Sequence, residues 1–174
     1  MEHSMLQGLR AMRVGLVLAF LAVLFGFGMG AAFGAAEDSL KGGLKSDAQA
    51  VLDSQYGGDA AKAKEVTDKA WSYYKRAHMH GGGIGAAAIA AILALAAVRG
   101  PSKMSMLAAF GMGFGALGYS IFWLWAGCRA PGMGSTSAAK ESLEWLAVPT
   151  SGAVIVGWFL ATILIAGALF RPAK

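Results

Sequence analysis

Residues 14–36 read VGLVLAFLAVLFGFGMGAAFGAA, an unbroken run without a charged side chain. An α-helix rises about 1.5 Å per residue, so this stretch can cross the roughly 30 Å hydrocarbon layer of a bilayer. Three further uncharged stretches follow at residues 80–98, 104–128 and 148–170. The sequence therefore predicts an all-α integral membrane protein with four spans.

The composition agrees with a protein that lies mostly in lipid. Hydrophobic residues make up 56% of the 174 positions and charged residues 14%, whereas soluble domains carry about 25% charged residues. The four spans use more than half of the chain. We therefore expect a single membrane domain over residues 1–174, with no second globular domain.

The distribution of charge predicts the orientation. Six basic residues flank the spans on one side, where the only acid is Glu2: Arg10, Arg13, Arg99, Lys103, Arg171 and Lys174. The other side carries the remaining nine basic residues and nine acids. Because short cytoplasmic segments are enriched in Lys and Arg, we expect both termini in the cytoplasm and residues 37–79 and 129–147 outside the plasma (inner) membrane. The net charge of +5 then needs no nucleic-acid partner.

The first span has a second interpretation, as a cleaved signal peptide. Basic residues precede it, and Gly34-Ala35-Ala36 offers the small residues that a signal peptidase accepts. However, its apolar run exceeds the usual 7–15 residues of a signal core. We expect the span to be retained; cleavage would leave three spans.

Small residues recur every third or fourth position along the spans. Without a hydrophobic drive between helices in lipid, such stripes let backbones approach closely and pack. The glycines that we expect at helix contacts are Gly26, Gly30, Gly34, Gly81, Gly85, Gly111, Gly115 and Gly157. They predict a tight four-helix bundle. They could equally face other membrane subunits or a second copy of the chain.

The segment between the first two spans predicts a helical hairpin on the outer face. Leu44 and Ala48 have helical spacing, Gly57 and Gly58 interrupt the pattern, and Asp59 suits the N-cap of a second helix. We expect this second helix to continue into the span at residues 80–98. Aromatic residues at its end are typical of a belt at the lipid headgroups, namely Trp71, Tyr73 and Tyr74.

The residues with most chemical character are His78 and His80, at the expected outer mouth of the second span. Imidazole ligates haem iron, copper and zinc. Two residues two positions apart on a helix project about 200° from each other, so the pair cannot share one metal. His78 lies on nearly the same face as Gly85, with Gly81 and Gly82 to either side, and glycines beside a ligand leave room for a flat porphyrin.

A haem b bound by either histidine would need a methionine as second ligand, such as Met29, Met79 or Met133, a single axial bond, or a histidine from another subunit. The alternative is that both histidines are polar anchors or hydrogen-bond partners for a neighbouring helix, and this is the interpretation we favour. Cys128 is the only cysteine. It cannot form an internal disulfide, and we expect it to be buried beside the helices.

The sequence offers many packing signals and no recognisable catalytic set. No Asp, Glu, Lys or Arg lies within a predicted span, although ion pathways usually require them. The leading hypothesis is a small non-catalytic accessory or scaffold subunit of a larger membrane complex. The alternatives are a redox protein that binds haem b or copper through His78 or His80, and a small-solute channel or transporter.

Overall fold

The computed structural model describes residues 2–170, with side chains from Met5 onward. Within this range the chain forms helices and no strands. In chain order the seven helices of the described residues are α1 (Glu2–Ala11), α2 (Arg13–Ala50), α3 (Leu52–Tyr56), α4 (Ala60–Val98), α5 (Lys103–Arg129), α6 (Thr136–Glu141) and α7 (Glu144–Leu169). The predicted helical fold class is therefore confirmed.

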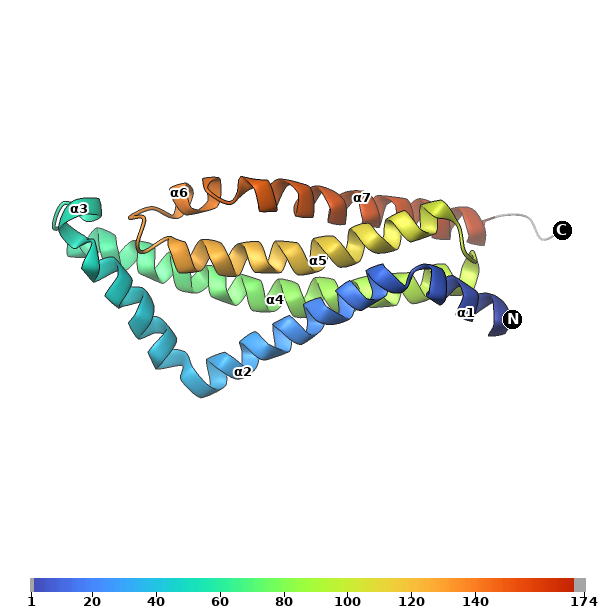
Figure 1. The fold of residues 1–174 in the computed structure, drawn as a ribbon, viewed down its shortest axis with the longest axis horizontal. Helices are drawn as coiled ribbons and strands as arrows, with labels where there is room; N and C mark the ends of the chain where they lie inside the picture. Colours follow the sequence, from blue (N-terminus) through green and yellow to red (C-terminus); the bar gives the residue numbers. More distant parts are fainter. Residues whose placement is uncertain (1, 171–174) are drawn as a thin grey trace.

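Four of these helices, α2, α4, α5 and α7, are long and apolar enough to cross a membrane. They run alternately up and down, side by side (Figure 1). Helix α5 is central: it packs against α2, α4 and α7. The most extensive contacts join α2 to α4 and α5 to α7, so α2 and α7 lie at opposite edges of the assembly.

One end of the assembly gathers the basic residues that flank the spans. Helix α1, the turn between α4 and α5, and the end of α7 lie together there (Figure 1). This places Arg10, Arg13, Arg99 and Lys103 at the same end. Arg171 and Lys174, which contribute to the same charge pattern, lie outside the described residues.

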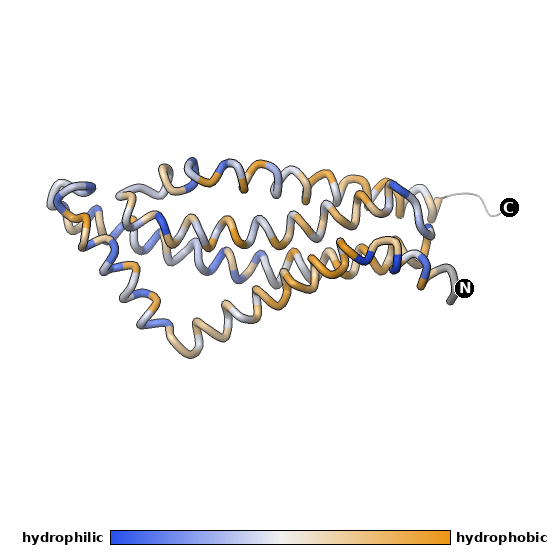
Figure 2. The backbone as a smooth tube through the Cα atoms, in the orientation of Figure 1, coloured by the Kyte–Doolittle hydropathy of each residue, from blue (hydrophilic) through white to orange (hydrophobic). Residues whose placement is uncertain are grey.

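Helix α2 changes direction at an elbow within its length. Ala36 has non-helical torsions, φ −145° and ψ 26°, immediately before Glu37, the first charged residue after Arg13. The part before Ala36 is mainly hydrophobic and the part after it is mixed (Figure 2). Leu44 and Ala48 of the second part are buried where α2 returns toward α4. We call residues 37–50 the α2 arm.

A tight reversal joins the α2 arm to α4. Gly57 and Gly58 have positive φ, 62° and 78°, in the left-handed region that glycine adopts without strain. Asp59 then caps α4, since its Oδ1 accepts hydrogen bonds from the backbone N–H of Ala61 at 2.9 Å and of Lys62 at 3.0 Å. The predicted N-cap is confirmed. From there α4 continues without interruption to Val98.

Glycines allow close backbone approach between α5 and α7. A Cβ on Gly111 would lie 2.7 Å from the carbonyl oxygen of Ala153, and one on Gly157 would lie 2.6 Å from the backbone nitrogen of Met112. A Cβ on Gly115 would likewise lie 2.7 Å from the carbonyl oxygen of Thr150. These distances are too short for a real side chain, so the two helices meet backbone to backbone.

The glycines of α2 and α4 do not all behave alike. Gly26, Gly81 and Gly85 lie where these helices touch: a Cβ on Gly26 would be 2.5 Å from the nitrogen of Gly82. Gly30 instead faces a side chain, the ring of His78. Gly34 has open space around it, since a Cβ at this position would meet no other part of the described chain within 4 Å. The four-residue stripe therefore loses contact as α2 approaches its elbow.

Candidate functional site

His78 lies between α4 and α2, beside the part of α2 that precedes the elbow. Its Nδ1 is 2.7 Å from the carbonyl oxygen of Gly26, and a Cβ on Gly30 would come within 2.9 Å of its Cε1. Phe33 meets the ring edge-on, with centroids 5.7 Å apart. His78 therefore joins the two helices, and the absence of a side chain at Gly30 makes room for it.

The partner of His78 fixes its tautomer. A carbonyl oxygen can only accept, so Nδ1 must carry the proton and donate to Gly26. In the neutral ring Nε2 then has a free lone pair. Imidazoles that bind metals are often oriented in this way, but an available nitrogen needs space for the metal and its other ligands.

Protein fills part of the space that a porphyrin would need beside His78. A Cβ on Gly81 would lie 2.8 Å from the carbonyl oxygen of Ala22, and one on Gly85 would lie 3.0 Å from that of Ala19. Both glycines therefore accommodate the backbone of α2. Of the three glycines that favoured haem in the sequence, these two serve helix packing, whereas a Cβ on Gly82 would meet nothing in the described chain within 4 Å.

His80 faces α5, away from His78. Its ring stacks on Tyr119 with centroids 5.3 Å apart and an interplanar angle of 11°, and it meets Trp123 edge-on at 6.4 Å. The guanidinium of Arg76 lies 4.7 Å from the Trp123 ring centroid, within cation–π range. His80 thus belongs to a cluster of rings between α4 and α5, and the two histidines serve different helix contacts.

The methionines considered as second ligands lie in different surroundings. Met79 is 63% exposed, whereas Met29 and Met133 pack against a cluster around Leu44 and Tyr74. In the part of the chain that the structure describes, no three His, Cys, Asp or Glu side chains gather as a metal site would require. No cluster of this kind among the described residues supports a copper or zinc site with several protein ligands, and the haem hypothesis, which needs one or two axial ligands, stays a prediction.

Two expectations about neighbouring residues are wrong. Cys128 is exposed and not buried, because it lies at the C-terminal end of α5; its sulfur is 3.1 Å from the hydroxyl of Tyr74. Tyr73 and Tyr74 are buried and do not form a surface belt. Tyr73 packs on Trp123 with centroids 4.8 Å apart, so these rings fill the contact between α4 and α5.

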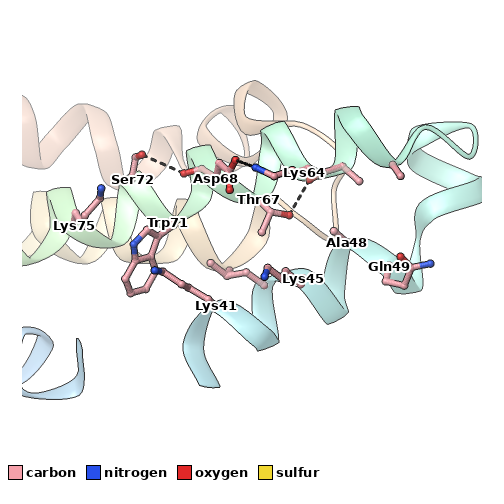
Figure 3. Close-up of a pocket in the computed structure, with 13 residues that line it drawn as sticks. Lys41, Lys45, Ala48, Gln49, Lys64, Thr67, Asp68, Trp71, Ser72 and Lys75 are labelled. Atoms are coloured by element: carbon pink, nitrogen blue, oxygen red, sulfur yellow. Dashed lines mark hydrogen bonds and ion pairs between the residues drawn. The ribbon is translucent and has the colours of Figure 1, made fainter. Parts of the chain in front are cut away.

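A groove between the α2 arm and α4 is the feature that the sequence did not indicate. It has a volume of about 760 Å³. Lysines dominate its polar lining, with Lys41 and Lys45 on the α2 arm and Lys64 and Lys75 on α4. We call it the lysine groove; Figure 3 shows Lys41 and Lys45 on the arm, across from Trp71 and Thr67 of α4.

The lysine groove carries an excess of positive charge. Its lining has four lysines and one carboxylate, Asp68. Asp68 accepts a 2.6 Å bond from Lys64, and Glu37, one turn before Lys41, pairs with that lysine. Lys45 and Lys75 form no ion pair within the described residues.

Helical spacing could have revealed the two faces that line this groove, although not the groove itself. Lys41, Lys45 and Ala48 follow one another at intervals of three or four, as do Lys64, Asp68, Trp71 and Lys75, so each set shares a helix face. What the spacing does not show is that the two faces meet, because this depends on the elbow at Ala36.

Comparison with known proteins leaves the function open: no protein-family model, curated protein or solved structure matches this chain.

Proposed function

We propose that the chain is a small, non-catalytic integral membrane protein that acts as an accessory or scaffold subunit in a larger complex of the plasma (inner) membrane. Its four long helices form a bundle in the bilayer, with both termini in the cytoplasm and the hairpin outside. The observation that carries this proposal is the contrast between a tightly closed interior and large apolar side chains on the outer edges.

The close helix contacts support a binding role over transport. Along α5 and α7 the backbones meet at Gly111, Gly115 and Gly157, which leaves no width for a solute between these two helices. Gly81 and Gly85 have the same effect between α2 and α4. A small-solute channel would need polar lining and space at such positions.

The outer edges have the composition expected of surfaces in lipid or against other spans. Leu24 and Phe27 on α2 are 61% and 67% exposed, and Ile155 and Phe159 on α7 are 67% and 66% exposed. Contiguous apolar surface of this kind is a liability in water. In a bilayer it suits acyl chains, and it offers two separate faces to partner subunits.

Photo-crosslinking in cells tests the proposal. A photoreactive amino acid is placed at Leu24 or Phe159, one on each outer edge, and at Met112, a fully buried control on α5. We expect at least one outer position to give a protein adduct of discrete mass, identified by mass spectrometry and recovered with the full-length chain in mild detergent. Lipid adducts alone, together with a strictly monomeric protein, would overturn the proposal.

A further inference from the structure

We infer that the lysine groove binds a phosphate-bearing anion, with the headgroup of an anionic phospholipid as its occupant. This inference does not depend on whether the chain has partner subunits. It rests on three observations. Four lysines line one groove, the hydroxyls and the carboxylate of the lining already have hydrogen-bond or ion-pair partners, and the groove lies along α4 just beyond its apolar span.

Lysines of both helices line the groove. Lys41 and Lys45 are one turn apart on the α2 arm, and α4 supplies Lys64 and Lys75 from the other side. Leu44, Ala48 and Ala63 complete the lining with apolar surface. A cleft with walls of one sign raises the local concentration of the opposite charge more than a flat patch does.

The internal ion pairs would not prevent an anion from entering. The Lys64–Asp68 pair is exposed, with 76% and 64% of the two side chains accessible, and surface pairs contribute little. Lys45 and Lys75 lack even such a pair in the described chain. The groove therefore retains a positive charge that its own carboxylates do not neutralise.

The groups that the groove leaves free for a ligand suit a phosphate better than a flat ring or a hydroxyl-rich ligand, because the hydroxyls and Trp71 already have partners. Thr67 donates to the Ala63 carbonyl at 2.8 Å, and Ser72 donates to that of Asp68 at 3.1 Å. Trp71 is already in contact with Phe33, at a centroid distance of 5.0 Å, and with the ammonium of Lys41, at 5.1 Å. What stays available is a set of ammonium groups, which recognise phosphate as point charges.

The position of the groove favours lipid as the source of that phosphate. Lys75 lies six residues before Gly81, or about 9 Å along the helix, and Trp71 lies one turn further out. Amphipathic rings are enriched at this level of the membrane. The inner end of the groove thus meets the headgroup layer, where lysines attract anionic lipid.

Native mass spectrometry of the full-length protein in mild detergent tests the inference, with phosphatidylglycerol, phosphatidylcholine or glycerol phosphate added separately. The test variant is Lys45→Gln with Lys75→Gln. The matched control is Lys62→Gln with Lys69→Gln, which removes the same charge from exposed positions of α4 outside the groove. We expect the test variant to bind phosphatidylglycerol about tenfold more weakly, and the control to bind as the wild type does.

The other arms separate the sources and guard against misfolding. Lys45→Arg with Lys75→Arg keeps the charge and should retain binding. Preference for phosphatidylglycerol over both other probes supports lipid as the occupant. Groove-dependent binding of glycerol phosphate, with no preference for the lipid, would overturn the lipid assignment and keep the anion site. Equal loss in test and control variants, or no retention of any anion, would overturn the inference.

Discussion

The hydroxyl of Tyr56 donates a hydrogen bond of 2.7 Å to the backbone carbonyl of Pro131, which lies 75 residues further along the chain. This bond ties α3, at the tip of the hairpin, to the loop after α5. A Cβ on Gly134 of that loop would lie 2.7 Å from the Cβ of Gln55. The loop therefore also packs closely against the residue that precedes Tyr56. The hairpin is therefore fixed to the rest of the molecule at its far end as well as through the helices that it joins.

Tyr56→Phe should loosen the tip without unfolding the bundle. The ring still packs against Ala48 and Ala63, but the Pro131 carbonyl loses its partner, at a cost of about 1–3 kcal/mol. Hydrogen exchange of α3 in detergent should rise accordingly. Ser54→Ala, which removes an exposed 3.3 Å bond to Val51, is the control and should change exchange little; equal effects of the two variants would argue against the Tyr56–Pro131 bond.

The same contact should weaken at alkaline pH. Burial raises the pKa of Tyr56 above its ordinary value of 10.0, so the folded tip keeps the phenol protonated while the unfolded chain releases the proton near that value. The contribution to stability is present below about pH 10 and is lost as the pH rises toward the folded pKa. Thermal melts between about pH 8 and 11 should show wild type converging on Tyr56→Phe; a gap that widens with pH would contradict this sign.

Two glycines of α7 provide a matched test of the helix packing. Gly157→Ala puts a methyl group 2.6 Å from the Met112 nitrogen and 2.9 Å from the Ala108 carbonyl oxygen, and should destabilise the protein by about 1–3 kcal/mol. Gly152→Ala adds the same methyl group in open space and should be neutral or slightly stabilising. Thermal unfolding in detergent distinguishes them, and similar midpoints would show that the α5–α7 contact tolerates separation.

A double-mutant cycle tests the contact between Gly30 and His78. Gly30→Ala should displace the ring, because the new methyl group would lie 2.9 Å from Cε1, and should weaken its bond to Gly26 by about 1 kcal/mol. Gly28→Ala, where the methyl group would meet nothing in the described chain within 4 Å, is the control. In a His78→Ala background the effect of Gly30→Ala should disappear, since its partner is gone; an unchanged effect would place its cause elsewhere.

Cys128 gives a test of orientation that needs no engineered cysteine. It is the only cysteine in the chain and is exposed at the hairpin end of α5. If this end lies outside the cell, a membrane-impermeant maleimide should label intact cells expressing the wild type and not those expressing Cys128→Ser. Labelling only after the membrane is permeabilised would reverse the proposed topology.

The sequence was sufficient for the helical class and the four long apolar helices, because uncharged runs of that length have few other solutions. It was not sufficient for α2. The residues on both sides of Ala36 favour helix, and the change of direction depends on Leu44 and Ala48 reaching α4. Local spacing cannot report a contact with a helix that begins ten residues or more downstream.

The glycine pattern was only partly predictable for a similar reason. A search at four-residue intervals finds Gly111 and Gly115, which face α7, but passes over Gly113, which projects to the other side and meets the backbone of Gly15. Gly127, against Ala70 and Tyr74, was missed too. A helix with neighbours on several sides needs small residues on several faces, and a single stripe describes only one of them.

The unbroken course of α4 has a mechanical consequence. Its 39 residues form a rod of about 58 Å that carries one wall of the hairpin at one end and the apolar span at the other. A bilayer of different thickness changes the tilt of a spanning helix, and a tilt of about 10° about the helix centre would move its hairpin end by about 5 Å. Because no hinge interrupts α4, the position of the hairpin would depend on the thickness of the membrane.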